Sequence, residues 1–191
     1  LSAIIMSPVN PLISMKKLTS LLIFVGLAIN VSGQEEPKNL KEAMDVAKAH
    51  WLIGDWERTR SNGSKQQVSY RWAVKDGVIS FQVSQGGETT IQGVIGFDSI
   101  SGKVVGKNMG RGGGVDSEWA VIEGKLIETV KGSRKNQEGE ITSISTARSH
   151  RKVDENTMEQ IHYRVTESGE MGEAWKREDG TIYVQTFKRK K

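Results

Sequence analysis

The sequence predicts an all-β protein: an antiparallel up-and-down barrel of about eight to ten strands, preceded by one helix. Three observations predict it. After Gly54, apolar residues recur at every second position, which is the period of a strand with one buried face. Turn signals such as Asp76-Gly77 separate these segments at short intervals. No helical pattern lies between them, and parallel crossovers need a dozen or more residues, so the sheet is antiparallel.

Closure of this sheet is expected because a long open sheet leaves two unpaired edges. A sandwich of two sheets is the alternative for the same strands, and we favour the barrel. A barrel of this size has room for side chains or for one small ligand inside. The predicted architecture therefore makes the barrel interior the first place to look for a site.

Residues 1–33 have the pattern of a secretory signal peptide, with Met15 as the expected start. Two lysines follow Met15, then a short apolar run, and the small residues Val31 and Gly33 would direct cleavage before Gln34. The run is shorter than the roughly 20 residues of a membrane-spanning helix. We expect export to the periplasm or the exterior, with no stable membrane anchor after cleavage.

Composition narrows the function further. The chain contains no cysteine, which removes disulfides, lipid attachment and thiol chemistry. The formal charge of +4 falls to +2 without residues 1–33, which carry two lysines and no acids, so nothing points to nucleic acid as a partner. The remaining chain is expected to comprise a linker and helix over 34–52 and a single barrel over 53–191.

The helix is predicted from a capping box and an apolar stripe. Asn39 is followed three residues later by Glu42, the usual start signal. The stripe that follows repeats at helical spacing and consists of Leu40, Ala43, Met44, Ala47 and Trp51.

The strands follow in order. The segment from Val68 to Val74 alternates, Asp76-Gly77 turns the chain, and a second alternating segment runs from Val78 to Val83. Further turns are expected at 86–87, 98–102, 110–114, 123–124, 136–139, 154–156 and 179–180.

The helix leads into Gly54-Asp55-Trp56, which resembles the Gly-x-Trp entry of lipocalins and other calycin barrels. The resemblance implies that Trp56 plugs the barrel floor beneath a basic residue, Lys188 or Arg189. The segments WLIGDW, YRWAVKDGVISFQV, GVIGFDSISGKVVG and SEWAVIEGKL are together similar to a group of uncharacterised exported bacterial lipocalin-like domains. The Thr-Asp-Tyr motif and disulfides of characterised lipocalins are absent, so the resemblance implies no ligand class.

Aromatic residues expected to point inward are the candidate ligand-binding residues. They either fill the barrel at close-packed density or line a partly open apolar cup, and both interpretations stay open. The candidates are Tyr70, Trp72, Phe81, Trp119, Tyr163 and Tyr183.

Catalytic motifs are missing. The sequence has no Gly-x-Ser-x-Gly, no His-Glu-x-x-His and no cysteine nucleophile, so no catalytic residue and no cofactor are predicted. Glu128 is the one carboxylate expected to face inward. His150 and His162 are expected to lie opposite each other but outward, beside several cations, so neither a metal site nor the axial haem ligand of nitrobindin-related barrels is predicted.

Three functions of different classes remain. The first is an exported carrier of a small apolar ligand held in the barrel. The second is an envelope structural or protein-interaction module without a ligand, which predicts a filled interior and an exposed apolar patch. The third is a barrel enzyme that uses Glu128 as a buried carboxylate with a perturbed pKa. We rank them in that order.

Overall fold

A computed structural model describes residues 37–136 and 138–190 of the chain. The predicted signal peptide over 1–33, its start at Met15 and the first part of the linker lie outside the described residues. Within the described part, no helix has the length and apolar character needed to cross a membrane.

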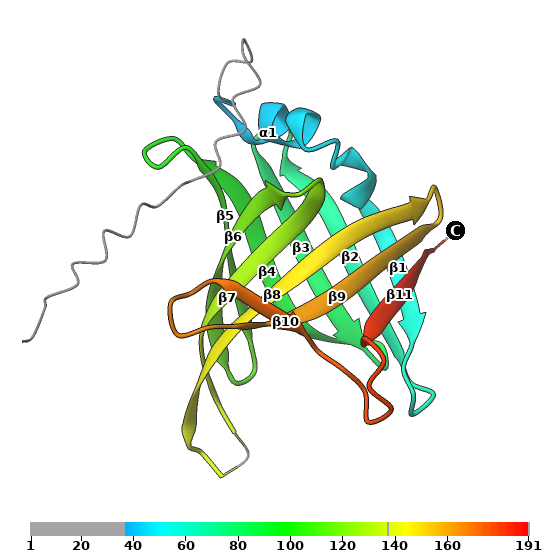
Figure 1. Ribbon diagram of the computed structural model, residues 1–191. Coiled ribbons are helices and arrows are strands. Elements are labelled where there is room, and N and C mark those ends of the chain that lie inside the picture. Colours follow the sequence, from blue (N-terminus) through cyan, green and yellow to red (C-terminus); the bar gives the residue numbers. More distant parts are fainter. Residues whose placement is uncertain (1–36, 137, 191) are drawn as a thin grey trace, which may run out of the picture. The chain divides into compact units, whose positions relative to one another are not determined.

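The described chain forms a closed antiparallel barrel of ten strands, which confirms the predicted fold class (Figure 1). From β1 to β10 each strand pairs with the next one along the chain, whereas β11 pairs with β9 on one side and closes the barrel by pairing with β1 on the other. The strands are β1 (Gly54–Thr59), β2 (Lys65–Val74), β3 (Val78–Gln85), β4 (Glu88–Asp98), β5 (Lys103–Gly110), β6 (Gly113–Ile122), β7 (Lys125–Lys135), β8 (Ile141–Asp154), β9 (Thr157–Val165), β10 (Met171–Ala174) and β11 (Val184–Arg189).

The last position in the barrel wall is shared by two strands. β10 pairs with the second half of β9, and β11 pairs with its first half, on the same edge. Between them, residues 175–183 leave the wall as a small hairpin whose base joins the Tyr183 N–H to the Trp175 carbonyl at 2.8 Å. The wall is therefore interrupted beside β9.

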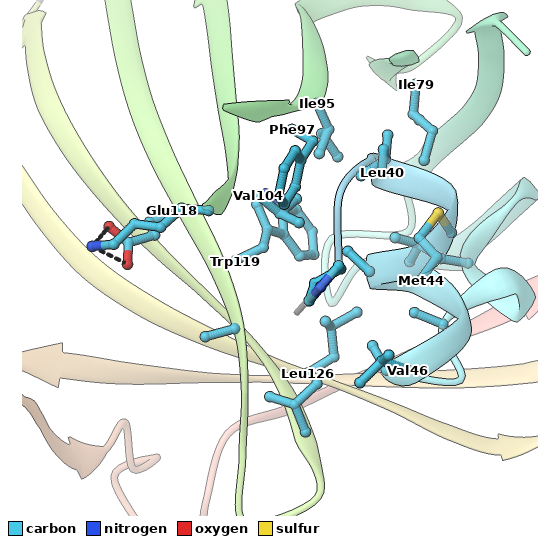
Figure 2. Close-up of a pocket in the computed structure, with 18 of the residues that line it drawn as sticks. Leu40, Met44, Val46, Ile79, Ile95, Phe97, Val104, Glu118, Trp119 and Leu126 are labelled. Carbon is cyan, nitrogen blue, oxygen red and sulfur yellow. Dashed lines mark hydrogen bonds and ion pairs between the residues drawn. The ribbon is translucent and has the colours of Figure 1, made fainter. Parts of the chain in front are cut away.

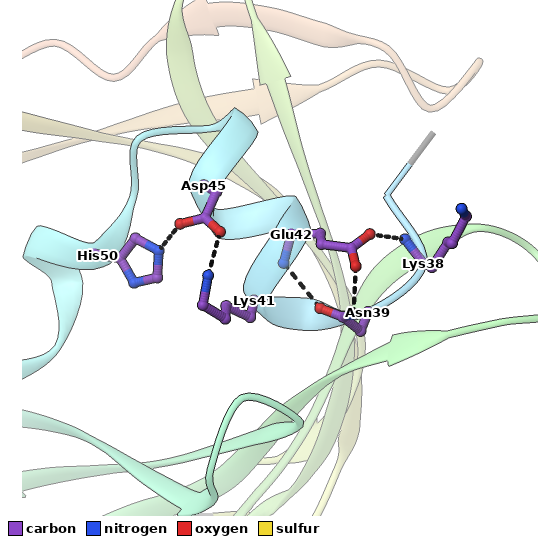
Figure 3. Close-up of polar contacts among 6 residues, drawn as sticks. All are labelled: Lys38, Asn39, Lys41, Glu42, Asp45 and His50. Carbon is purple, nitrogen blue, oxygen red and sulfur yellow. Dashed lines mark hydrogen bonds and ion pairs between the residues drawn. The ribbon is translucent and has the colours of Figure 1, made fainter. Parts of the chain in front are cut away.

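The helix is shorter than the sequence pattern predicts. α1 (Leu40–Val46) begins with Asn39, whose side chain accepts a hydrogen bond from the Glu42 N–H at 2.9 Å, as the capping signal predicts (Figure 3). The helix ends before Trp51, because Lys48 adopts a left-handed backbone with φ of 50°. Trp51 instead belongs to η1 (His50–Leu52), a short 3₁₀ turn.

α1 closes one end of the barrel. Its buried face, Leu40 and Met44, packs on the apolar core, and the Lys41 N–H donates to the Asp76 carbonyl at the β2–β3 turn. On the opposite face, Asp45 accepts hydrogen bonds from Lys41 and pairs with the exposed His50 (Figure 3). The helix thus buries a narrow apolar stripe over the barrel end, as an amphipathic helix does.

Trp56 lies at this closed end and is only 1% exposed. Its indole N–H donates to the Leu52 carbonyl at 2.9 Å, and the Arg189 guanidinium carbon lies 4.3 Å from the ring centroid. Arg189 also donates to the carbonyls of Ile53 and Trp51. Of the two basic residues considered, Arg189 covers the tryptophan, while Lys188 donates elsewhere, to Thr157.

Candidate functional site

Two hollows lie along the barrel interior. The first, called here the helix-end pocket, has a volume of about 310 Å³ and lies between α1 and strands β3 to β7 (Figure 2). Its wall is mostly apolar and includes Leu40, Met44, Ile79, Ile95, Phe97, Val104, Trp119 and Leu126.

The second hollow, called here the open-end cavity, lies at the barrel end opposite α1 and has a volume of about 360 Å³. It is lined from β3, β4, β5, β6, β7, β8 and β9, and its wall combines aliphatic and aromatic side chains with basic ones. The lining includes Phe81, Val83, Ile91, Asn108, Val115, Val130, Ile144, Thr146, Arg148 and His162, with Arg111 and Arg134 at the mouth.

A polar layer separates the two hollows. On β7, Leu126 lines the helix-end pocket and Val130 lines the open-end cavity, so Glu128 lies between them. The Glu128 carboxylate lies 2.8 Å from the Arg148 guanidinium and 3.3 Å from His150 Nε2. Gln160 lies 3.2 Å from His150 Nδ1, which fits a neutral imidazole that donates through Nε2.

Burial and the neighbouring charged groups set the protonation states of Glu128 and His150 in this layer. Burial opposes ionisation of Glu128, yet Arg148 and His150 together hold the pKa of this carboxyl below its ordinary value. Burial lowers the pKa of His150 against the pull of Glu128, so the imidazole is neutral. The layer is therefore an ion pair of Glu128 and Arg148 with a neutral histidine bonded to it.

Four of the six candidate aromatic residues lie on the inner side of the barrel. Tyr70 is 5% exposed and lies 5.9 Å from Phe81 between ring centroids, and burial raises its pKa. Trp72 packs against the core, and Phe81 lines the open-end cavity. Trp119 lines the helix-end pocket and lies 4.9 Å from the His150 ring.

The other two aromatic candidates lie elsewhere. Tyr163 was expected inside, but it follows the inward-facing His162 and therefore lies on the outer face, where its hydroxyl is 3.4 Å from Ser149 Oγ. Tyr183 lies at the base of the 175–183 hairpin, with its hydroxyl 3.4 Å from Arg58. Neither residue lines the open-end cavity or the helix-end pocket.

The expected placement of the two histidines is also wrong. Arg148 pairs with His162 and His150 pairs with Gln160, so the histidines are not directly opposite each other. Both point into the barrel, and the His150 side chain has no exposed surface. The expectation failed because Ile161 and Tyr163 were taken to mark the inner face, whereas the interior here holds the polar layer.

His162 connects the open-end cavity to the 175–183 hairpin. Its ring lies 5.3 Å from the ring of Trp175, and the backbone N–H of Trp175 donates to the His162 carbonyl. Burial, followed by the charge of Arg148 and with a smaller contribution from Arg58, lowers the pKa of His162 to about 4, although a hydrogen bond with Gln185 opposes the shift. The Nε2 atom of His162 and the Nε atom of Arg148 are buried and have no hydrogen-bond partner among the described residues.

The described residues contain no cluster of three or more histidine, aspartate or glutamate side chains that could hold a metal ion.

Comparison with known protein families, with curated proteins and with solved structures finds no match for this chain. The interpretation of the site therefore depends on its own geometry.

Proposed function

We propose that this chain is an exported binding protein that holds one small, largely apolar molecule in the open-end cavity. One observation carries the proposal: a cavity at the unplugged end of the barrel combines an apolar wall with a few convergent polar groups. Small-molecule sites have this form, and they commonly include a residue with a perturbed pKa, as His162 is here.

The cavity volume of about 360 Å³ favours a small occupant. Ligand pockets in proteins span about 300–1,000 Å³, so this one is near the lower limit. The helix-end pocket is of similar size. The indole N–H of Trp119, which lines it, already donates a hydrogen bond to Ser117 Oγ. Within the described part of the chain, the buried side-chain polar atoms that lack a partner belong to Arg148 and His162, which both line the open-end cavity.

An enzyme that uses Glu128 is less favoured by this geometry. A buried general acid needs a raised pKa, and Glu128 has the opposite shift because it pairs with Arg148 and His150. Glu128 also does not line the open-end cavity. Its contacts fit a counter-ion that holds Arg148 in place.

An envelope interaction module is the second candidate, and the outer face of the barrel favours it. Val94, Val105 and Met109 lie on neighbouring strands with 48%, 36% and 65% of their surface exposed. Exposed apolar groups that gather on a surface are typical of protein-interaction sites. Under this alternative the cavity stays without a ligand.

Native mass spectrometry of the purified protein, followed by denaturation, tests the choice. The proposal predicts a stoichiometric small molecule, or binding of added decan-1-ol as an apolar probe. Binding should change tryptophan fluorescence mainly through Trp175, whose ring lies against that of the cavity residue His162, so Trp175→Phe should lose most of the change. An undiminished change in that variant would place the probe in the helix-end pocket beside Trp119, and the absence of any binding would favour the interaction module.

Export is tested separately. Expression of the full chain in a bacterial host with a secretion pathway should yield a protein that begins at Gln34 outside the cytoplasm. A protein that stays in the cytoplasm with its first residues intact would overturn this part of the proposal.

A further inference from the structure

The open half of the barrel contains more positive than negative charge. Two guanidinium groups, Arg58 and Arg148, act together on His162, while one buried carboxylate, Glu128, faces them. Arg148 is paired with Glu128 at 2.8 Å. Arg58 instead donates to neutral groups, the Gln66 side chain at 2.6 Å and the Tyr183 hydroxyl at 3.4 Å.

No carboxylate of the described residues pairs with Arg58, although its side chain is partly buried over the Phe187 ring. A charge taken from water without a counter-ion is costly, and proteins usually compensate it by pairing. Arg58, like Arg134 at the cavity mouth, thus has no carboxylate counter-ion among the described residues.

Two polar atoms without a hydrogen-bond partner among the described residues lie at the open-end cavity. Arg148 Nε and His162 Nε2 are both buried and lack a hydrogen-bond partner among the described residues, and both residues line the open-end cavity. About nine in ten or more buried polar groups in proteins have a partner. The lining of this cavity includes no aspartate or glutamate to supply one.

We propose that the open-end cavity binds a small monocarboxylic acid, with its carboxylate on Arg148 and its apolar body against Phe81, Ile91 and Val130. This inference rests on the proposed function and adds the chemical class of the ligand. A guanidinium presents several N–H donors in a planar fork that matches a carboxylate, and Glu128 leaves Nε unused. The apolar wall around this donor favours a carboxylate with an apolar body over inorganic phosphate.

Two probes that differ only in the head group test the proposal by isothermal titration calorimetry. Decanoate carries the carboxylate, and decan-1-ol has the same chain with a neutral hydroxyl. A charge-assisted hydrogen bond predicts that decanoate binds roughly tenfold to a hundredfold more tightly than decan-1-ol. Inorganic phosphate should bind weakly or not at all.

Arg148→Lys tests the residue. Lysine keeps a positive charge opposite Glu128, so the ion pair is retained, but it lacks the Nε donor. Affinity for decanoate should fall at least about tenfold and affinity for decan-1-ol should not change. Arg151→Lys is the matched control, because Arg151 is also on β8 and pairs with Glu159, away from the cavity.

The outcomes separate this inference from the proposed function. Equal binding of both probes to the natural chain, or unchanged decanoate affinity in Arg148→Lys, would overturn the carboxylate site and leave apolar binding intact. Binding of neither probe would overturn both. The head-group comparison on the natural chain decides the matter even if Arg148→Lys does not fold, and thermal melting of each variant reports whether it does.

Discussion

His162 should make the stability of the barrel depend on pH between 6.5 and about 4. Burial, followed by the charge of Arg148, lowers the pKa of this imidazole from 6.5 to about 4 in the folded chain. Below pH 6.5 the unfolded chain therefore takes up a proton that the folded chain does not bind until the pH approaches 4. The unfolded state binds more protons in this interval, so the free energy of unfolding falls as the pH falls.

The magnitude follows from the two pKa values. At pH 5 an unfolded histidine is almost fully protonated and the folded His162 is mostly neutral, which corresponds to about 2 kcal/mol of lost stability. The side chain is only partly buried, so solvent screening reduces the expected effect to about 1–2 kcal/mol. Below pH 4 both states are protonated and the loss levels off.

Urea unfolding of the natural chain and of His162→Gln, each at pH 7 and pH 5, measures the effect. Glutamine does not titrate, so the loss of stability between pH 7 and pH 5 should be smaller in the variant by about 1–2 kcal/mol. Each protein is compared with itself at the two pH values, so the cost of losing the ring contact with Trp175 cancels. His150, whose pKa is also lowered by burial, remains in both proteins. An equal loss in the two proteins would refute the placement of His162 inside the barrel.

Three other substitutions have definite expected results. Gly93→Ala would place a Cβ 2.5 Å from the Phe81 ring, so overpacking should lower stability by about 1–3 kcal/mol in thermal unfolding, and an unchanged melting temperature would contradict this contact. Asn39→Ala removes the helix cap and should cost about 1 kcal/mol in urea unfolding, whereas Asn39→Asp should cost little because aspartate is also a good cap. Glu128→Gln leaves Arg148 without its buried counter-ion and should cost about 3 kcal/mol, and a neutral result would show that the ion pair contributes no stability.

The fold could be predicted because its signals are local. Alternation after Gly54 and turn residues such as Asp76-Gly77 fix strands and hairpins, and short connections allow only an antiparallel meander. The end of α1 was missed because Trp51 continues the helical spacing of the apolar stripe. Only the left-handed backbone at Lys48 shows that the helix has already ended. Sequence periodicity does not report such a break, because lysine has no special preference for that conformation.

The polar interior was harder to predict. Glu128 was expected inside, but Arg148, His150 and His162 were expected outside, since the alternation rule assigns apolar residues to the core. One signal was available: Glu128 and Arg148 face each other across β7 and β8, so an inward Glu128 requires an inward Arg148. The rule failed here because the residues of a barrel interior need not all be apolar when their polar groups satisfy one another.

The position of Arg148 also sets how a carboxylate would enter. Along β8, Thr142 is opposite Arg134 near the mouth, Thr146 is opposite Val130, and Arg148 is opposite Glu128 at the polar layer. Arg148 is thus at the deep end of the open-end cavity, and an acid bound there would enter head first. Desolvation of a carboxylate is costly, but the guanidinium that receives it is already partly buried, with its Nε atom buried, and is held by Glu128, so little reorganisation is needed on binding. Acids with a longer apolar body should then extend toward the mouth, and affinity should rise with chain length until the tail reaches solvent.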